Sequence, residues 1–301
     1  MAKAKKIAII NNKGGSAKTT TAVNLAGAYA NNYPNRKVLI VETDGQGNAT
    51  RSFNLNSKSF NQSMYDIFMG NNTPEECVIN VYENIDLIPA NNAMNFVEFD
   101  IMNRFGDEVA DNVVDMLKEE GVPISQLNEE SLKSVIRSQT VMSDNYFNML
   151  SGKFDDIENQ YDLIIFDTPP EVKAVTSSIL AISDEIIIPF EPETYSIDGI
   201  MNILSRIADI KEKKNNNLNI AGLLAVKVRN NTKLHIDTIN SVMKYCNKNN
   251  LYYFETEIPN SIRFGSATGY SGIPATIAQK ENSFVKSYYS LLEELLEMGV
   301  L

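Results

Sequence analysis

The stretch KIAIINNKGGSAKTTT, residues 6–21, decides how the rest of this chain is organised. Lys6–Asn11 is a short apolar run bounded by polar residues, which is typical of a strand buried on both faces. Gly14 and Gly15 then allow the backbone to turn tightly and to approach a ligand closely. Residues from Lys18 onward fit helical spacing. The pattern therefore predicts a strand, a glycine-rich turn and a helix.

This turn also predicts a phosphate-binding site, because free N–H groups and the positive helix end point at a bound anion. Lys18 is expected to reach the β- and γ-phosphates of a nucleotide, and the Thr19 hydroxyl to bind Mg²⁺. The stretch departs from the pattern G-x-x-x-x-G-K-[ST], since Asn12 and Ala17 replace the two glycines. It fits the variant K-G-G-x-x-K-[ST], which is headed by an additional lysine, Lys13.

The variant loop resembles that of the ParA/MinD family of ATPases, and three more stretches extend the resemblance over most of the chain. VETDGQGNAT (41–50) is similar to the family motif D-x-D-P-Q-G-N-A-T, and YDLIIFDTPP (161–170) to its Walker B strand. IPFEPETYSIDGI (188–200) is similar to the strand and helix entry that follow. Within the family, the chain looks most like the small, Soj-like ParA partition ATPases.

The resemblance implies a role for individual residues. Lys13, Lys18 and Asp44 form the catalytic set, in which Lys13 reaches across to the phosphates of a partner subunit and Asp44 orients the attacking water. Asp167 is expected to hold Mg²⁺ through a water or to assist Asp44. The implied nucleotide-binding residues are Lys13, Gly14, Gly15, Ser16, Ala17, Lys18, Thr19 and Thr20, with Pro259 and Asn260 bracketing the adenine, and the implied metal residues are Thr19, Asp44 and Asp167.

The chain departs from the family pattern at several positions. Glu42 replaces the first aspartate of the second motif, and Gly45 replaces its proline, a change that would loosen the turn. In the implied DNA site, Asn231 and Asn260 stand where the family carries arginines, so this site matches less well than the ATP site. The DNA-binding residues expected from the resemblance and from the basic charge around them are Arg263, Arg229, Lys227 and Lys233.

Composition excludes several classes of protein. The two cysteines, Cys77 and Cys246, are not at metal-ligand spacing, which excludes a disulfide framework and favours a reducing cytosol. The same observation disfavours the related nitrogenase iron protein, which holds its cluster with cysteines. No apolar run approaches 18 residues, so the sequence predicts no membrane span. The basic start MAKAKK leads into a core strand and not into a signal sequence.

The net charge of −11 is unevenly distributed along the chain. Residues 61–170 hold 21 Asp and Glu against 5 Lys and Arg, whereas residues 201–280 hold 11 Lys and Arg against 5 Asp and Glu. A solvated charge run is the usual reading of one such segment, but an opposed pair is compatible with a one-sided basic face.

The predicted fold class is α/β: a doubly wound, mostly parallel, twisted sheet of about seven or eight strands with helices on both faces, as in Rossmann-like P-loop NTPases. Residues 1–301 are expected to form a single domain. A helical, acidic elaboration is expected at about 91–160, as cover for the sheet or as a partner or dimer surface. Strands are predicted at residues 6–11, 37–43, 85–89, 161–167, 184–190, 221–228 and 251–258.

The predicted function is that of a cytoplasmic, Mg²⁺-dependent partition ATPase. The resemblance implies that it dimerises on ATP, binds non-specific DNA on the nucleoid, is stimulated by a centromere-binding ParB-like adaptor protein and is released by hydrolysis. One alternative is a MinD-like positioning ATPase acting on a membrane or protein scaffold. It is disfavoured because the polar face of the predicted last helix, residues 283–298, is acidic. Another is an ATP-dependent metabolic ligase, which Lys13 and the second motif disfavour.

Overall fold

A computed structural model describes residues 3–119, 128–140, 148–229 and 232–301. Within them, one seven-stranded sheet has the order β3-β4-β2-β5-β1-β6-β7. Every pairing is parallel except β3 with β4, which confirms the predicted α/β class and the mostly parallel sheet. The strands are β1 (Lys5–Ile9), β2 (Val38–Glu42), β3 (Ile79–Tyr82), β4 (Ile85–Ile88), β5 (Leu163–Asp167), β6 (Glu185–Phe190) and β7 (Asn219–Ala225).

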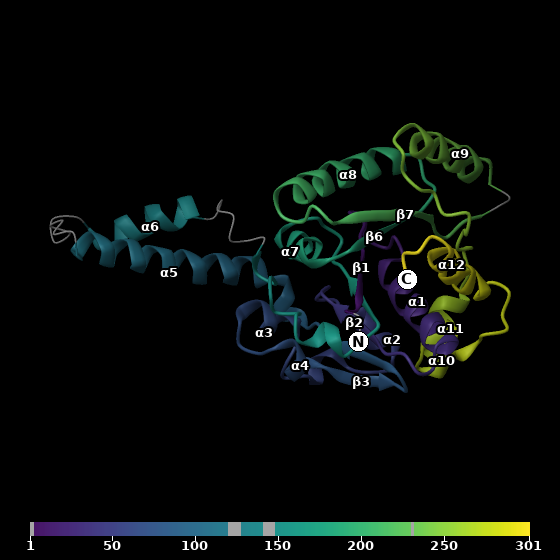
Figure 1. Ribbon diagram of the computed structural model, residues 1–301, viewed down its shortest axis with the longest axis horizontal. Helices are drawn as coiled ribbons and strands as arrows, with labels where there is room; N and C mark the ends of the chain where they lie inside the picture. The colour runs from purple at the N-terminus through teal and green to yellow at the C-terminus, as the bar shows by residue number, and fades with distance from the viewer. Residues whose placement is uncertain (1–2, 120–127, 141–147, 230–231) are drawn as a thin grey trace.

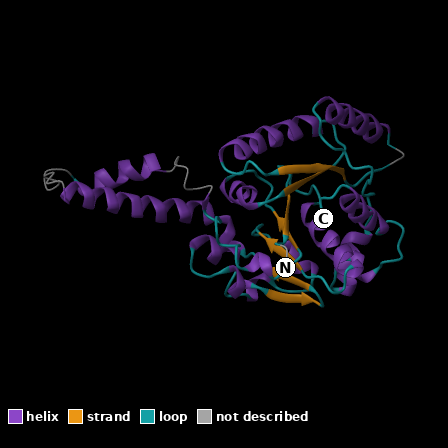
Figure 2. Cartoon of the chain, in the orientation of Figure 1, coloured by secondary structure: helices purple, strands orange, loops and turns teal. Residues whose placement is uncertain are grey.

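Helices cover both faces of the sheet (Figures 1 and 2). Successive strand residues point to opposite faces, so Ile7 and Ile9 belong to one buried cluster and Ala8 to another. The first cluster is closed by α1 (Lys18–Asn32) and α12 (Lys286–Glu297). The second is closed mainly by α7 (Ala174–Ile182), α8 (Ser196–Lys213) and α9 (Lys233–Lys248).

The helix α8 illustrates why these segments form helices against the sheet. Its buried residues Ile200, Ile203, Ile207 and Ile210 recur at intervals of three and four, which places them on one face. Each buried isoleucine contributes about 1.5–3 kcal/mol relative to exposure. Short elements complete the body: α2 (Asn48–Ser52), α3 (Met64–Met69), α4 (Pro74–Cys77), α10 (Arg263–Ser271), α11 (Ala275–Ala278) and 3-10 turns at Ser57–Ser59, Asn92–Asn95 and Ile157–Asn159.

The prediction of a strand at residues 251–258 is wrong. This segment runs beside β7 but forms with it one isolated bridge, Leu223 with Tyr253, and a few backbone hydrogen bonds. The backbone N–H groups of Glu255 and Thr256 donate instead to the Glu294 carboxylate of α12, at 2.7 and 3.0 Å. Because a side chain takes these donors, no continuous ladder forms.

The strand β3 was not predicted from the sequence. It forms a hairpin with β4, the third predicted strand, and it is the antiparallel edge of the sheet. Its residues are only partly buried or exposed, so it lacks the apolar run that marks the central strands. Mixed sheets of this kind commonly carry an antiparallel edge strand.

Two helices of the acidic elaboration form an arm, α5 (Val97–Glu119) and α6 (Glu129–Thr140), that projects from the body (Figure 1). Val97 and Ile101 at its base belong to the core. Farther out, Ala110 and Val114 are also buried but belong to none of the core clusters. Asn128 caps α6, accepting from the Ser131 N–H at 3.2 Å. Among the described residues of the arm, the contacts with the core are therefore at its base.

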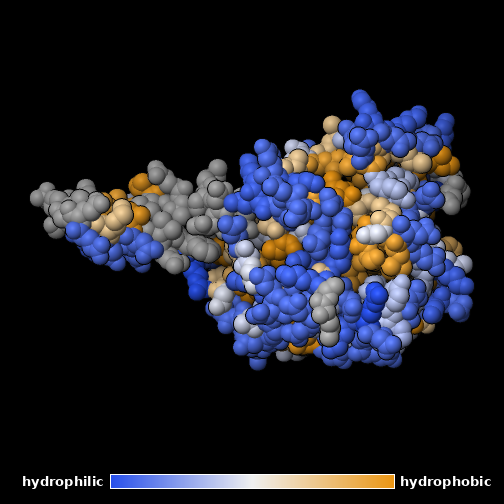
Figure 3. Space-filling model, viewed as in Figure 1, coloured by the Kyte–Doolittle hydropathy of each residue, from blue (hydrophilic) through white to orange (hydrophobic). Residues whose placement is uncertain are grey.

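The surface seen in Figure 3 is mostly hydrophilic, with apolar side chains gathered over a limited area of the body. Among the helices of the described residues, none combines the length and apolar character that crossing a membrane requires. The apolar residues Tyr288, Leu291, Leu292 and Leu295 of α12 are buried in the core.

Candidate functional site

The phosphate loop connects the end of β1 to the start of α1. Gly15 has φ +75° and Ala17 has φ +59°, so two residues lie in the left-handed region. The first is a glycine, which tolerates this region, whereas Ala17 is strained there by about 1 kcal/mol. Asn11 holds the loop in place, because its amide donates to the Pro189 carbonyl at 2.6 Å and accepts from the Lys13 N–H at 2.7 Å.

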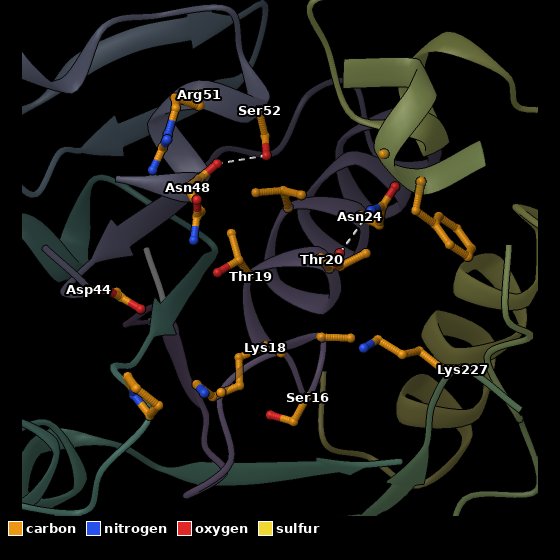
Figure 4. A pocket seen from close by; sticks show the side chains of 17 residues that line it. Ser16, Lys18, Thr19, Thr20, Asn24, Asp44, Asn48, Arg51, Ser52 and Lys227 are labelled. Carbon is orange, nitrogen blue, oxygen red and sulfur yellow. Dashed lines mark hydrogen bonds between the residues drawn. The ribbon is translucent and has the colours of Figure 1, made fainter. Parts of the chain in front are cut away.

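A cavity of about 450 Å³ opens between this loop and the helices α2 and α10, a size that suits a small-molecule ligand (Figure 4). It lies beyond the carboxyl ends of β1 and β2, where open α/β sheets bind ligands. Seven consecutive residues, 14–20, form its floor, and Asp44 and Lys227 stand on opposite sides in Figure 4. The other lining residues are Val23, Asn24, Asn48, Arg51, Ser52, Pro170, Phe264 and Gly265.

Lys18 is the buried cation of this cavity. Its ammonium donates to the Lys13 carbonyl at 3.3 Å, so the side chain folds back over the loop. Burial lowers the pKa of Lys18, while the carboxylates of Asp167 and Asp44 oppose this effect. A cation placed over the loop N–H groups makes the site strongly attractive to phosphate.

Asp167 ends β5 directly beside the last residue of β2, Glu42. Its side chain is fully buried, and neither carboxylate oxygen has a hydrogen-bond partner among the described residues. Burial is the main reason that the pKa of Asp167 is raised to about 8, while the nearby Thr19 hydroxyl lowers it. An unpartnered carboxylate beside a hydroxyl is a donor set that suits a hard cation such as Mg²⁺.

Asp44 follows the end of β2 and is half-buried at the cavity. One carboxylate oxygen accepts from the Gln46 N–H at 2.9 Å, and the Asp44 carbonyl accepts from the Gly47 N–H at 3.0 Å. A tight turn therefore presents this carboxylate to the cavity. Asp44 and Asp167 both act on the pKa of Lys18, so the structure brings these three predicted residues together.

Glu42, the replacement for the family aspartate, is a buried anchor. Its carboxylate accepts from the Ala49 and Thr50 N–H groups, from the Thr50 hydroxyl and from the Ala90 N–H at 3.2 Å. Burial raises the pKa of Glu42 to about 6, although these hydrogen bonds oppose the shift. The hydrogen bonds of Glu42 therefore link the start of α2 to the segment that follows β4.

Gly45 also affects how closely its turn packs against neighbouring residues. A side-chain carbon at this position would meet the Asn95 side-chain oxygen at 2.8 Å and the Asn91 carbonyl at 3.1 Å. A contact of 2.8 Å is shorter than real carbon atoms adopt, so a larger residue would push the Asn95 side chain aside and the Asn91 carbonyl back by a few tenths of an ångström. Glycine thus allows the closest packing here.

Several lining residues were not found from the sequence. Asn48, Arg51 and Ser52 belong to α2, where Asn48 is part of the second motif and the other two follow it directly. Arg51 is held by the Gly47 carbonyl at 3.2 Å, and the Asn24 amide donates to Thr20 at 2.8 Å. Asn48 within the motif and Arg51 directly after it could have been found from the sequence, whereas Phe264 and Gly265 reach the cavity only through the tertiary fold.

The structure separates other predicted residues from the cavity. Pro259 lines a different cavity, with Val228 and Glu257, and Asn260 is likewise absent from the nucleotide-cavity lining. In the amide orientation that satisfies its neighbours, Asn260 accepts from the Arg229 guanidinium at 2.9 and 3.2 Å. The adenine contact expected from Pro259 and Asn260 stays a prediction, and neither residue lines the nucleotide cavity.

The predicted DNA-binding residues fall into two places. Lys227 lines the nucleotide cavity. Lys233 and Arg263 begin α9 and α10 and are exposed, as is Arg229. The backbone N–H of Arg229 donates to buried His235 at 3.3 Å. Asn231 lies outside the described residues.

Comparison with known proteins agrees with this geometry. A family model described as an AAA domain matches residues 4–121 and 125–220. A ParA family protein of Mycoplasma genitalium is 28% identical over 97% of both chains. The chromosome-partitioning ATPase Soj of Thermus thermophilus is 25% identical over 98% of this chain and 96% of that protein.

A solved structure with the same fold is cobyrinic acid a,c-diamide synthase of Mycobacterium smegmatis, with bound ATP analog and magnesium. Its TM-score is 0.72 at 20% identity, covering 98% of this chain and 95% of that one. At this identity the likeness concerns the fold alone. The matched family model spans most of the chain, and the relatives span nearly all of it, so this protein belongs to the ParA/MinD type of the AAA-domain ATPase family.

Proposed function

We propose that this protein is a Mg²⁺-dependent partition ATPase that dimerises on ATP, binds non-specific DNA and is released from it by hydrolysis. The observation that carries the proposal is the convergence of Lys18, Asp44 and the unpartnered Asp167 carboxylate at one phosphate-binding loop. The partition role is supported by relatives named for it, which match nearly the whole chain.

In this proposal the residues divide the work of phosphoryl transfer. Residues 14–20 bind the phosphates through backbone N–H groups, and Lys18 neutralises their charge. Thr19 and Asp167 hold Mg²⁺, which when bound supplies further charge neutralisation. Asp44, held by its tight turn, orients the attacking water.

The dimer and the adaptor belong to the same proposal. Lys13 lies at the head of the loop, where an exposed ammonium can reach the phosphates of a partner subunit as an arginine finger does elsewhere. A ParB-like adaptor protein would stimulate hydrolysis, and the ATP-bound dimer would associate with the nucleoid. Exposed Arg263, Arg229 and Lys233 supply candidate contacts to the DNA backbone.

The structure favours this function over the membrane alternative. The apolar face of α12 is buried against the core, and the carboxylate of its Glu294 accepts a hydrogen bond from the backbone of the segment 251–258. An amphipathic membrane helix needs an exposed apolar face and commonly has a basic polar one. Neither feature is found on α12.

The test uses Asp44→Ala, which should keep ATP affinity but lose hydrolysis by orders of magnitude, because only the water is mispositioned. In ATP the variant should accumulate as a dimer that co-sediments with duplex DNA and not with anionic liposomes. Lys18→Ala is the matched control and should lose ATP binding. Normal turnover in Asp44→Ala would overturn its assigned role, and liposome binding would favour the positioning alternative.

A further inference from the structure

Lys227 occupies an unexpected position beside the phosphate loop. It follows the end of β7, and its ammonium lies 3.9 Å from where a side-chain carbon on Gly15 would stand. It lines the same cavity as Lys18, Thr19 and Phe264. In Figure 4 it approaches the loop from the side opposite Asp44. Besides Lys18 and Arg51, the cavity thus has a further cation, on an element that carries none of the phosphate-loop residues.

The backbone at Lys227 is strained. Its φ of +54° lies in the left-handed region, which a lysine adopts at a cost of about 1–2 kcal/mol. Asn260 and Ile258 are bonded to the next residue, Val228, so the surrounding loops fix this conformation. A strained residue held by its surroundings is a common feature of ligand-binding sites.

Glu191 holds the Lys227 side chain in place. It follows β6, and its carboxylate lies 3.2 Å from the Lys227 ammonium. The Glu191 side chain is 17% exposed and that of Lys227 is 39% exposed, so the pair is partly shielded from solvent. An anionic ligand in the cavity would compete with Glu191 for this cation.

We infer that Lys227 is a nucleotide-binding residue that contacts the phosphates of ATP from the β7 side, with Glu191 as its counter-ion and positioning residue. This rests on the proposed ATP binding and replaces the DNA contact expected for Lys227. It predicts opposite effects for the two members of the pair. Removal of the lysine weakens nucleotide binding, and neutralisation of the glutamate strengthens it.

The experiment measures the affinity of the full-length protein for ATP, ADP and adenosine by calorimetry. Lys227→Met should weaken ATP and ADP binding about tenfold, as expected for one lost hydrogen bond between charged groups, and leave adenosine binding unchanged. Glu191→Gln should tighten ATP binding severalfold at low salt, and this gain should vanish in the double variant. Lys248→Met, at an exposed lysine that ends α9, is the matched control and should leave the affinity for all three ligands unchanged.

The outcomes separate the inference from the function on which it rests. If the parent protein binds no ATP, the proposed function fails. If the parent binds ATP and Lys227→Met binds it equally well, only the inference is overturned. Equal weakening for ATP and adenosine would reject the phosphate contact, as would a loss of DNA binding by Lys227→Met at saturating ATP with unchanged ATP affinity. Unchanged thermal stability without nucleotide shows that the variant is folded.

Discussion

Lys13 of the phosphate loop and Glu193, which follows β6, form an ion pair within this one chain. The Lys13 ammonium holds the pKa of the Glu193 carboxyl below its usual range. In the proposed dimer, Lys13 must leave this carboxylate to reach the phosphates of the partner subunit. Both side chains are about half exposed, and such surface pairs contribute little to stability. The pair is therefore weak enough to be exchanged for phosphate.

At the residue scale, we predict that Glu193→Gln favours the ATP dimer and that Lys13→Gln prevents it. Each pair broken on dimerisation costs up to about 1 kcal/mol, and a dimer breaks two, so the dimer constant should rise by up to about thirtyfold. Sedimentation velocity with ATP in the Asp44→Ala background measures this constant. A weaker dimer in Glu193→Gln would mean that this carboxylate contacts the partner subunit instead.

The arm of α5 and α6 is the element that departs most from a simple sheet-and-helix body. Lys133 of α6 pairs with Asp111 of α5 at 2.7 Å, and Val114 is buried outside the core clusters. Beyond the base of α5, where Val97 and Ile101 join the core, the described parts of the two helices thus pack on each other. Their interior should be separable from the nucleotide site, because distant sites without shared partners act independently.

At the element scale, we predict that Val114→Asp opens the arm without affecting the nucleotide site. A carboxylate in place of this buried valine should destabilise the packing of α5 on α6 by about 3 kcal/mol. Hydrogen exchange should accelerate in residues 105–119 and 128–140, while ATP affinity changes by less than about twofold. Met116→Asp, on an exposed position of the same helix, should leave exchange unchanged. Lost ATP binding in Val114→Asp would show that the arm supports the site.

The whole molecule combines an acidic middle segment with a basic final third, and the fold decides where each lies. Much of the acidic charge is on the projecting arm and on α3 and α4, while Arg229, Lys233 and Arg263 are exposed near the starts of α9 and α10. Arg229 and Asn260 are bonded to each other, so the two basic segments are adjacent in space. This arrangement is compatible with one DNA-binding face on a protein of net charge −11.

At the scale of the whole molecule, Arg263→Glu should weaken non-specific DNA binding severely and leave ATP hydrolysis intact. Each lost phosphate contact should also lower the slope of log affinity against log salt by about 0.9, and a dimer loses two. Fluorescence anisotropy with duplex DNA at several salt concentrations gives both quantities. Lys58→Glu makes the same change of sign at an exposed lysine outside the basic third and serves as the control. Binding equal to the parent would exclude Arg263 from the DNA face.

The sequence by itself determined the central strands, the phosphate loop and the family. Those signals are local: apolar runs predict buried strands, and the spacing from Lys13 to Thr19 is set by a single turn of backbone. Edge elements were harder to predict. The strand β3 has no apolar run, and two backbone N–H groups of the segment 251–258 donate to the Glu294 carboxylate.

The tertiary structure alone decided which distant residues meet. The direction of a side chain after a strand depends on the backbone angle there, and the left-handed Lys227 turns its ammonium into the nucleotide cavity. Asn260 lies beside Arg229 because two loops are paired through Val228. Contacts between segments far apart in the chain depend on packing and loop conformation, which no local pattern encodes. The cavity-lining residues that a motif carries, 14–20 and Asp44, were thus predictable, whereas the place of Lys227, Phe264 and Gly265 in the cavity was not.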